Sequence, residues 1–217
     1  LLALPTAFYT MFGGVQAVAW TDVKQMVLIV GGLLAVVVAL VIGLPDGVGL
    51  GDALQLAGTT GRMQTIDFRF DLTEKYTFWS GTIAAFFLFC SYFGTDQSQV
   101  QRYLTARSVD EARTSLLMSA YWKIPLQALV LLVGVLMFVF YVFTRPPMLF
   151  NAAHESQVKA SSRAGDYVAT ERRFAAAFDV QREAAANLTR VQRANDTAGT
   201  VEYTAAFSAA TAEVSAA

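Results

Sequence analysis

The run Cys90-Ser-Tyr-Phe-Gly-Thr-Asp-Gln-Ser-Gln-Val-Gln-Arg102 lies within Tyr76–Lys123, the stretch around which the rest of the chain is organised. An uncharged apolar helix is predicted up to this run. After a short charged loop, a second apolar helix containing the lone cation Lys123 is predicted. Polar groups at the end of one membrane helix and a charge within the next are costly in lipid. The stretch therefore indicates a functional site and not only a structural part of the membrane domain.

The composition indicates a membrane protein. Hydrophobic residues make up 55% of the chain and charged residues 15%, with a mean hydropathy of +0.44, whereas a soluble domain carries about 25% charged residues. Three runs have no charged residue: Met26–Leu44, Tyr76–Thr95 and Ile124–Thr144. Each has about 20 residues, or about 30 Å as a helix, which matches the hydrocarbon core of a bilayer. One such run would fit a buried soluble helix, whereas three between polar loops favour spans.

Other classes of protein are disfavoured. The chain begins Leu1-Leu-Ala-Leu-Pro5, with no initiator Met and no basic n-region, so we expect a piece of a longer protein and not a signal peptide. The absence of a basic patch argues against a nucleic-acid partner. Cys90 is the single cysteine, and the single His154 excludes a multi-histidine metal site in this fragment, so we expect no cofactor. No nucleophile–base pair is visible, so we expect no enzyme.

The chain divides into a transmembrane part, residues 1–145, and a polar part, residues 146–217. A tight turn is expected at Gly13-Gly14, after the end of a first span. The further spans are expected at about 15–43, 76–100 and 109–143.

Capping signals suggest where two of the helices begin. Asp71-Leu-Thr-Glu74 predicts a helix that begins near Leu72, and Ser108-Val-Asp-Glu111 predicts one that begins near Val109. Gly94–Gln99 is poor helix material at membrane depth. The helix has either ended there or is interrupted beside a polar cavity.

Two charged residues have open interpretations. Asp22 fits a solvated carboxylate in the first turns of a helix, or a carboxylate that attracts a cation at a pore mouth. Lys123 fits a snorkelling lysine, or a functional cation beside a kink at Pro125.

The polar part is predicted to form a helical hairpin outside the membrane. Residues 161–194 and 201–217 are rich in Ala and helix-prone, with a turn at 195–199 between them. Its positive and negative charges nearly cancel, which argues against an electrostatic membrane-binding helix, so we expect a spacer or cap. Basic residues are denser in 101–113 than in 45–75, which favours a cytoplasmic position for the former loop.

Three features of residues 1–145 resemble the sodium/solute symporter family, which contains the sodium-glucose, proline, pantothenate and iodide transporters. Tyr9-Thr-Met-Phe-Gly-Gly-Val-Gln-Ala-Val-Ala-Trp-Thr-Asp-Val-Lys-Gln25 looks like the family's Tyr-Thr…Gly-Gly…Ala-Val…Thr-Asp…Gln signature. Gly94-Thr-Asp-Gln-Ser-Gln-Val-Gln-Arg-Tyr-Leu-Thr-Ala-Arg-Ser108 is similar to its Gln…Gln-Arg segment. The spacing from Asp96 to Lys123 is similar to that of a lysine in the sugar transporters. Residues 150–217 match no motif and would be a long insertion.

The resemblance implies an all-α membrane protein: a fragment of a LeuT-type transporter, which has two five-helix inverted repeats, with an added extramembrane helical hairpin. The helix that ends near Gly94 would be the broken sixth core helix. The loop 101–113 would be cytoplasmic and the hairpin extracytoplasmic. The sodium ligands would lie on core helices outside this fragment.

The resemblance also implies roles for single residues. Asp22 matches a carboxylate that helps sodium leave toward the cytoplasm. Tyr92 matches a tyrosine that gates the substrate, and Phe93 a tryptophan that stacks on it. Lys123 matches a lysine that contacts the substrate; here it could instead pair an anionic substrate or Asp96.

Phe89 departs from the sugar-transporter pattern. It replaces a hydrogen-bonding Asn or Thr, and a phenyl ring cannot bond a sugar hydroxyl. The run Gln99-Val-Gln-Arg-Tyr-Leu104 resembles the iodide and monocarboxylate branch, which also points away from a sugar.

Together these features predict sodium-coupled symport of a small polar or anionic organic solute by alternating access, in a multi-pass protein of the plasma (inner) membrane. The expected partners are the lipid bilayer, Na+ and the solute. Two alternatives stay open: a solute sensor built on the same fold, and a membrane anchor or channel subunit without transport activity.

Overall fold

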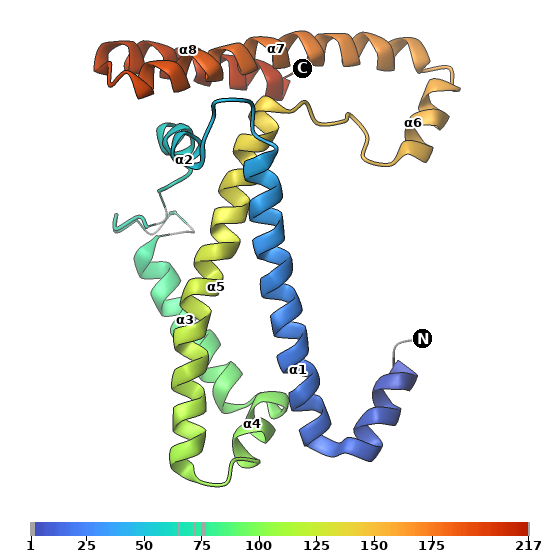
Figure 1. Cartoon of the computed structure of the whole chain (residues 1–217), viewed down its shortest axis with the longest axis vertical. Coiled ribbons are helices and arrows are strands. Elements are labelled where there is room, and N and C mark those ends of the chain that lie inside the picture. Colours follow the sequence, from blue (N-terminus) through green and yellow to red (C-terminus); the bar gives the residue numbers. More distant parts are fainter. Residues whose placement is uncertain (1–2, 65, 72, 75–76, 217) are drawn as a thin grey trace.

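The computed structural model describes residues 3–64, 66–71, 73–74 and 77–216 (Figure 1). Within these residues the regular structure is entirely helical. The helices are α1 (Ala3–Ile42), α2 (Leu50–Thr59), α3 (Phe78–Gly94), α4 (Gln97–Leu104), α5 (Val109–Phe143), α6 (Ala152–Lys159), α7 (Ala164–Arg193) and α8 (Thr197–Ala216).

Two of the described helices are long and apolar enough to cross a bilayer: α1 from Gln16 to Ile42, and α5. They run in the same direction, lie close together near α2 and diverge toward their N-terminal ends (Figure 1). Their apolar side chains are largely exposed; Leu28, for example, is 74% exposed and Ile124 68%. A core helix of a soluble protein would bury these groups, so the exposed surface favours contact with lipid or with further helices.

α1 is bent at Gly14, where the turn was predicted. Gly14 has φ 56° and ψ −153°, a conformation that only glycine adopts at little cost. The bend turns the residues before Gly14 away from the main axis of the helix (Figure 1).

The predicted start of the third helix, near Leu72, is wrong. Leu72 itself lies outside the described residues, but the helix begins only at Phe78. Its capping box is made by Thr77, whose side chain accepts from the Ser80 amide, and by Ser80, whose hydroxyl accepts from the Thr77 amide. Asp71 instead closes a local turn by accepting from the amide and hydroxyl of Thr73.

The expected span 76–100 is not one continuous helix, and the interruption lies within Gly94–Gln99, where the sequence indicated poor helix material. α3 has 17 residues and ends at Gly94, and α4 starts at Gln97 after a break at Thr95 and Asp96. This length is about 26 Å, at the short end of what spans a bilayer.

α5 begins as its capping box predicts. The Ser108 side chain accepts from the Glu111 amide at 3.1 Å, and the helix continues through Pro125 to Phe143. The Glu111 carboxylate accepts from the amide of Arg107, one residue before the predicted partner.

The main hydrophobic core lies at one end of the molecule, where α2 and the last turns of α1 and α5 meet; we call this the α2 end. α7 and α8, joined by a short turn, pack along each other and lie across it (Figure 1). The buried residues of the core come from these five helices and from the turn after α1, which supplies Leu44: Leu40, Leu44, Ala53, Leu56, Ala57, Leu136, Val139, Val142, Phe143, Ala185, Leu188 and Phe207. The opposite end, with α4 and the start of α5, is the α4 end.

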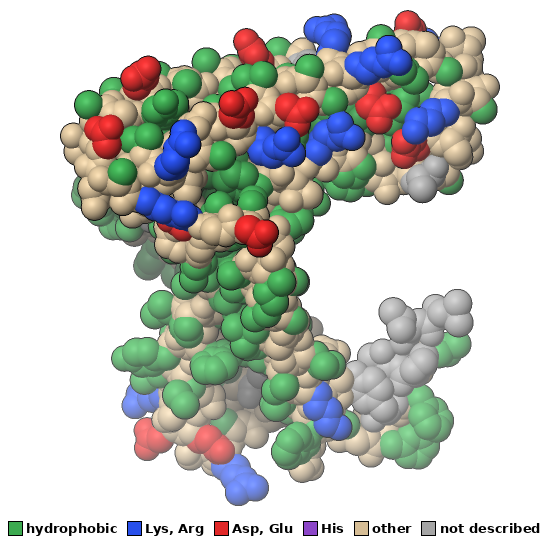
Figure 2. Space-filling view, turned by 45° about the horizontal axis from the view of Figure 1, so that its top comes forward, with side chains coloured by type: hydrophobic (Ala, Val, Ile, Leu, Met, Phe, Trp, Pro, Cys, Tyr) green, Lys and Arg blue, Asp and Glu red, His purple; other side chains and the backbone are tan. Residues whose placement is uncertain are grey.

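Charged side chains follow this division. On the face shown in Figure 2 they gather over α7 and α8 and again at the far end, with a mainly apolar stem between. The short helix α6, which the sequence did not predict, links α5 to α7.

Candidate functional site

Lys123 of α5 faces the last turn of α3. Its Nζ atom lies 5.3 Å from the centroid of the Phe93 ring and 5.8 Å from that of Tyr92. None of the ion pairs among the described residues includes Lys123. Lys123 is exposed, and its ammonium group lies over two aromatic faces, an interaction that contributes about 0.5–1 kcal/mol at an exposed site.

The aromatic rings form a continuous group, which we call the Lys123 cluster: Phe89, Tyr92, Phe93, Tyr103 and Lys123. Phe93 is at its centre, with ring centroids 5.8 Å from Phe89, 5.1 Å from Tyr92 and 6.5 Å from Tyr103. Phe89 and Phe93 are one helical turn apart and therefore share a face of α3. Three elements contribute: α3, α4 and α5.

Tyr103 was not singled out from the sequence as a site residue. Its position within Gln99–Leu104 was the available signal, because that run resembled one branch of the family. Tyr103 reaches the Phe93 ring because the chain turns between α3 and α4. The sequence alone does not give the direction of this turn.

The break next to this cluster is stabilised by local hydrogen bonds. The Thr95 amide and hydroxyl both donate to the carbonyl of Ser91, at 2.9 and 2.8 Å. The carbonyl of Asp96 then accepts from the amides of Gln99 and Val100, which starts α4. The Thr95 side chain and the first amides of α4 thus form hydrogen bonds with backbone carbonyls where α3 ends. An interrupted membrane helix requires such bonds.

The two carboxylates singled out from the sequence lie outside the ring contacts. Asp96 is half-buried at the break itself. Asp22 is half-buried on a different helix, α1, past the bend at Gly14. The structure thus brings together Phe89, Tyr92, Phe93 and Lys123, while Asp22 stays on another element.

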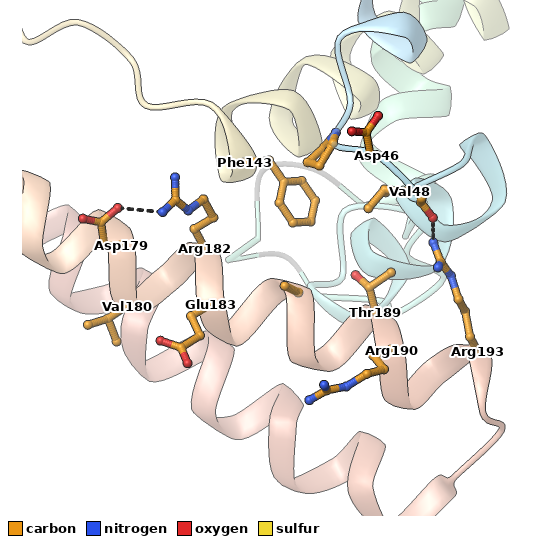
Figure 3. A pocket seen from close by; sticks show the side chains of 13 residues that line it. Asp46, Val48, Phe143, Asp179, Val180, Arg182, Glu183, Thr189, Arg190 and Arg193 are labelled. Carbon is orange, nitrogen blue, oxygen red and sulfur yellow. Dashed lines mark hydrogen bonds and ion pairs between the residues drawn. The ribbon is translucent and has the colours of Figure 1, made fainter.

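A pocket of about 750 Å³ lies elsewhere, at the α2 end between α7 and the turn before α2 (Figure 3). Its guanidinium groups already have partners: Arg182 pairs with Asp179, Arg190 donates to Asn187, and Arg193 donates to Asp52. Three carboxylates, Asp46, Asp179 and Glu183, balance them in its lining. A pocket with balanced, satisfied charges is a weaker candidate for a solute site than the Lys123 cluster.

No group of three His, Cys, Asp or Glu side chains in the described part of the chain is placed to hold a metal ion. The cluster offers one cation, aromatic faces and the two phenolic hydroxyls of Tyr92 and Tyr103. These groups can bind an anion or a polar group and cover an apolar one. They include no general base beside a nucleophile.

Comparison with known proteins places these features in a family. The model of the sodium:solute symporter family matches residues 1–138. The sodium/iodide cotransporter of Homo sapiens is 34% identical over 144 residues, which are 65% of this chain and 22% of that protein. The sodium-dependent multivitamin transporter of Oryctolagus cuniculus is 34% identical over 144 residues, 64% of this chain and 22% of that protein.

A third relative is the sodium-coupled monocarboxylate transporter 1 of Homo sapiens, 37% identical over 109 residues, 50% of this chain and 17% of that protein. The chain thus spans less than a quarter of the length of these relatives. No solved structure matches it. Because the family model covers most of the chain, including α1, α3, α4 and nearly all of α5, the chain belongs to the sodium:solute symporter family.

Proposed function

We propose that the protein carries out sodium-coupled symport of a small organic anion by alternating access. The observation that supports this most strongly is the Lys123 cluster, a cation held by aromatic rings beside a broken helix. The relatives named above are sodium-coupled transporters. This similarity does not favour the two alternatives, a solute sensor and a membrane anchor or channel subunit.

The charge of Lys123 is the main argument for an anionic solute. Lys123 is exposed in the part of the bundle that this chain forms. Once further membrane helices enclose it, the ammonium group would lose much of its hydration, and ring faces would replace only part of it. A carboxylate bound beside Lys123 would supply the missing opposite charge through a charge-assisted hydrogen bond. The apolar faces of Phe89 and Phe93 would then cover a short hydrocarbon part of the same solute.

Phe89 argues against a sugar as the solute. Its side chain has no hydrogen-bonding group, and 48% of its surface is exposed. A site that must bind several hydroxyls would leave them unpaired against this ring.

A LeuT-type arrangement would include a broken helix such as the pair α3 and α4. In such transporters discontinuous helices expose backbone groups that bind the solute and the coupling ions. The break between α3 and α4 lies toward the α4 end (Figure 1). α3 and α4 would be the two parts of such a helix. The coupling ion would be Na+, held by helices outside this chain, with Asp22 on its path toward the cytoplasm.

The same arrangement suggests an orientation in the plasma membrane. The α4 end, with Arg107 in the loop before α5 and Arg113 near the start of α5, would face the cytoplasm. The α2 end, with α7 and α8, would lie on the opposite side, so residues 146–217 would form an extracytoplasmic insertion.

Binding measurements on Lys123 variants test the proposal. A charge-assisted hydrogen bond contributes about 1.5–3 kcal/mol, so Lys123→Met should raise the Kd for a bound monocarboxylate about 10- to 150-fold. Lys123→Arg keeps the charge and should retain most of the affinity. Full-length protein in nanodiscs would be titrated with propionate, glucose and proline in the presence of sodium.

Lys24→Met is the matched control, because it removes an exposed lysine of α1 that lies outside the cluster. It should leave the Kd unchanged. If Lys123→Met and Lys24→Met bind propionate equally well, or if glucose binds better than propionate, the assignment of an anionic solute to this cluster is wrong.

A further inference from the structure

α7 and α8 are not a separate domain resting on the membrane part. Ala185 and Leu188 of α7 and Phe207 of α8 are at most 1% exposed, and they belong to the same core cluster as Leu56 of α2 and Val139 of α5. Removing α7 and α8 would expose these apolar side chains of α2 and α5. The pair is therefore part of the fold of the α2 end.

Arg193, the last residue of α7, makes the most specific polar contact across this junction. Its Nε donates to Asp52 Oδ1 at 2.9 Å and its Nη2 to Asp52 Oδ2 at 2.7 Å, a two-point contact with one carboxylate. Nη2 also donates to the carbonyl of Gly47. Figure 3 shows Arg193 reaching from the end of α7 to the turn before α2.

Asp52 has a second role at the same place. Its Oδ2 also accepts from the amide of Gly49 at 2.8 Å, which closes the first turn of α2. The Arg193 guanidinium, chiefly through its hydrogen bonds, and the Gly49 amide hold the pKa of Asp52 below its usual value, against an opposing effect of burial. Each charge also suits its helix end, with the carboxylate at an N-terminus and the guanidinium at a C-terminus.

The other side of α2 is tied to α5. The Arg62 guanidinium, just after α2, lies 4.1 Å from the centroid of the Phe138 ring of α5. Gly43 at the end of α1 approaches the Phe140 ring so closely that a Cβ atom would lie 2.8 Å from Phe140 Cε2. The ends of α1, α2 and α5 are thus fixed to one another as well as to α7.

We infer that α7 and α8 form an intramolecular clamp that holds α2 on the ends of α1 and α5, with Arg193 as the residue that fixes α2. The ends of α1 and α5 then move as one body. Relative movement of these helices is confined to the α4 end, where their side chains are exposed and the two helices diverge (Figure 1). The clamp rests on the packing alone and not on the proposed transport.

Hydrogen exchange of the α2 amides measures the clamp without a transport assay. In full-length protein in nanodiscs, Arg193→Ala should increase the exchange of residues 50–59 about fivefold, the effect of a well-aligned but partly exposed ion pair. Arg190→Ala is the matched control on the same helix, because Arg190 bonds within α7 only, and it should change nothing.

A double variant separates the ion pair from the other roles of its members. Asp52→Asn keeps an oxygen that can accept from Gly49, so its effect should come mainly from the lost charge. Asp52→Asn with Arg193→Ala should then exchange little faster than Arg193→Ala alone. Equal exchange in Arg193→Ala and Arg190→Ala, or effects that multiply fully in the double variant, would overturn the clamp. Propionate binding unchanged in all of these variants would leave the proposed function intact.

Discussion

Leu188→Ala is the sharpest test of how the polar part of the chain is joined to the membrane helices. Leu188 is fully buried in α7, within the cluster that includes α2, α5 and α8. Alanine at this position removes most of the side chain and leaves a cavity that the surrounding helices can only partly close.

The expected cost is about 2–5 kcal/mol, the range for leucine-to-alanine changes in packed cores. The lower limit corresponds to about a 30-fold larger fraction of molecules in which α7 has separated locally from α2. Val180, on the same helix, is 54% exposed, so Val180→Ala should change stability by no more than about 0.5 kcal/mol.

Hydrogen exchange with peptide-level mass spectrometry would compare the two variants in nanodiscs. In Leu188→Ala, residues 50–59 should exchange at least about 30-fold faster than in the parent protein, while Val180→Ala should stay within about twofold. If both variants behave alike, then α7 packs on the membrane helices too loosely to stabilise them, and the shared core is wrong.

Two further outcomes are expected. Gly43→Ala should lower the unfolding temperature, because its Cβ would lie 2.8 Å from the Phe140 ring, an overpacking cost of about 1–3 kcal/mol. Gly31→Ala is the control, because a Cβ atom at this position of α1 meets open space, and it should raise the unfolding temperature slightly. Shifts of the same sign for both variants in a thermal unfolding assay would argue against close contact of α1 and α5. The contribution of the Arg193–Asp52 pair should also depend on pH. The pKa of Asp52 is lowered from its usual 3.8 in the folded protein, so this contribution is fully present above that value and is lost as the pH falls through the folded pKa. Protection of α2 that the pair provides should therefore be constant from pH 8 to 5 and be lost below about pH 3.8; a loss near pH 6, or an Asp52→Asn protein with the same acid transition, would refute this.

Local signals in the sequence predicted several helix ends correctly. The Ser108 capping box and the glycines before Val15 each act over four residues or fewer, and the structure shows both. The start of α3 was mispredicted because Asp71-Leu-Thr-Glu74 and Thr77–Ser80 compete as caps. Thr77 and Ser80 make the reciprocal bonds and start the helix, whereas the hydrogen bonds of Asp71 to the amide and hydroxyl of Thr73 close only a local turn.

Contacts between distant residues could not be predicted in this way. Arg193 and Asp52 are far apart in the sequence, and nothing near either residue points to the other. The site was partly predictable: polar residues after an apolar helix and a lysine within the next helix suggested that they face each other. The approach of Tyr103 to Phe93 depends on the angle of the chain at Thr95 and Asp96, which propensity alone does not specify.

Uptake driven by a sodium gradient is the decisive measurement for sodium-coupled symport. Full-length protein in proteoliposomes would receive radiolabelled propionate, with an inward sodium gradient or with choline replacing sodium. We expect transient accumulation of propionate above its outside concentration with sodium, none with choline, and a marked loss of affinity in Lys123→Met. Uptake that is equal with and without sodium, or no accumulation of any monocarboxylate, sugar or amino acid tested, would contradict sodium-coupled symport.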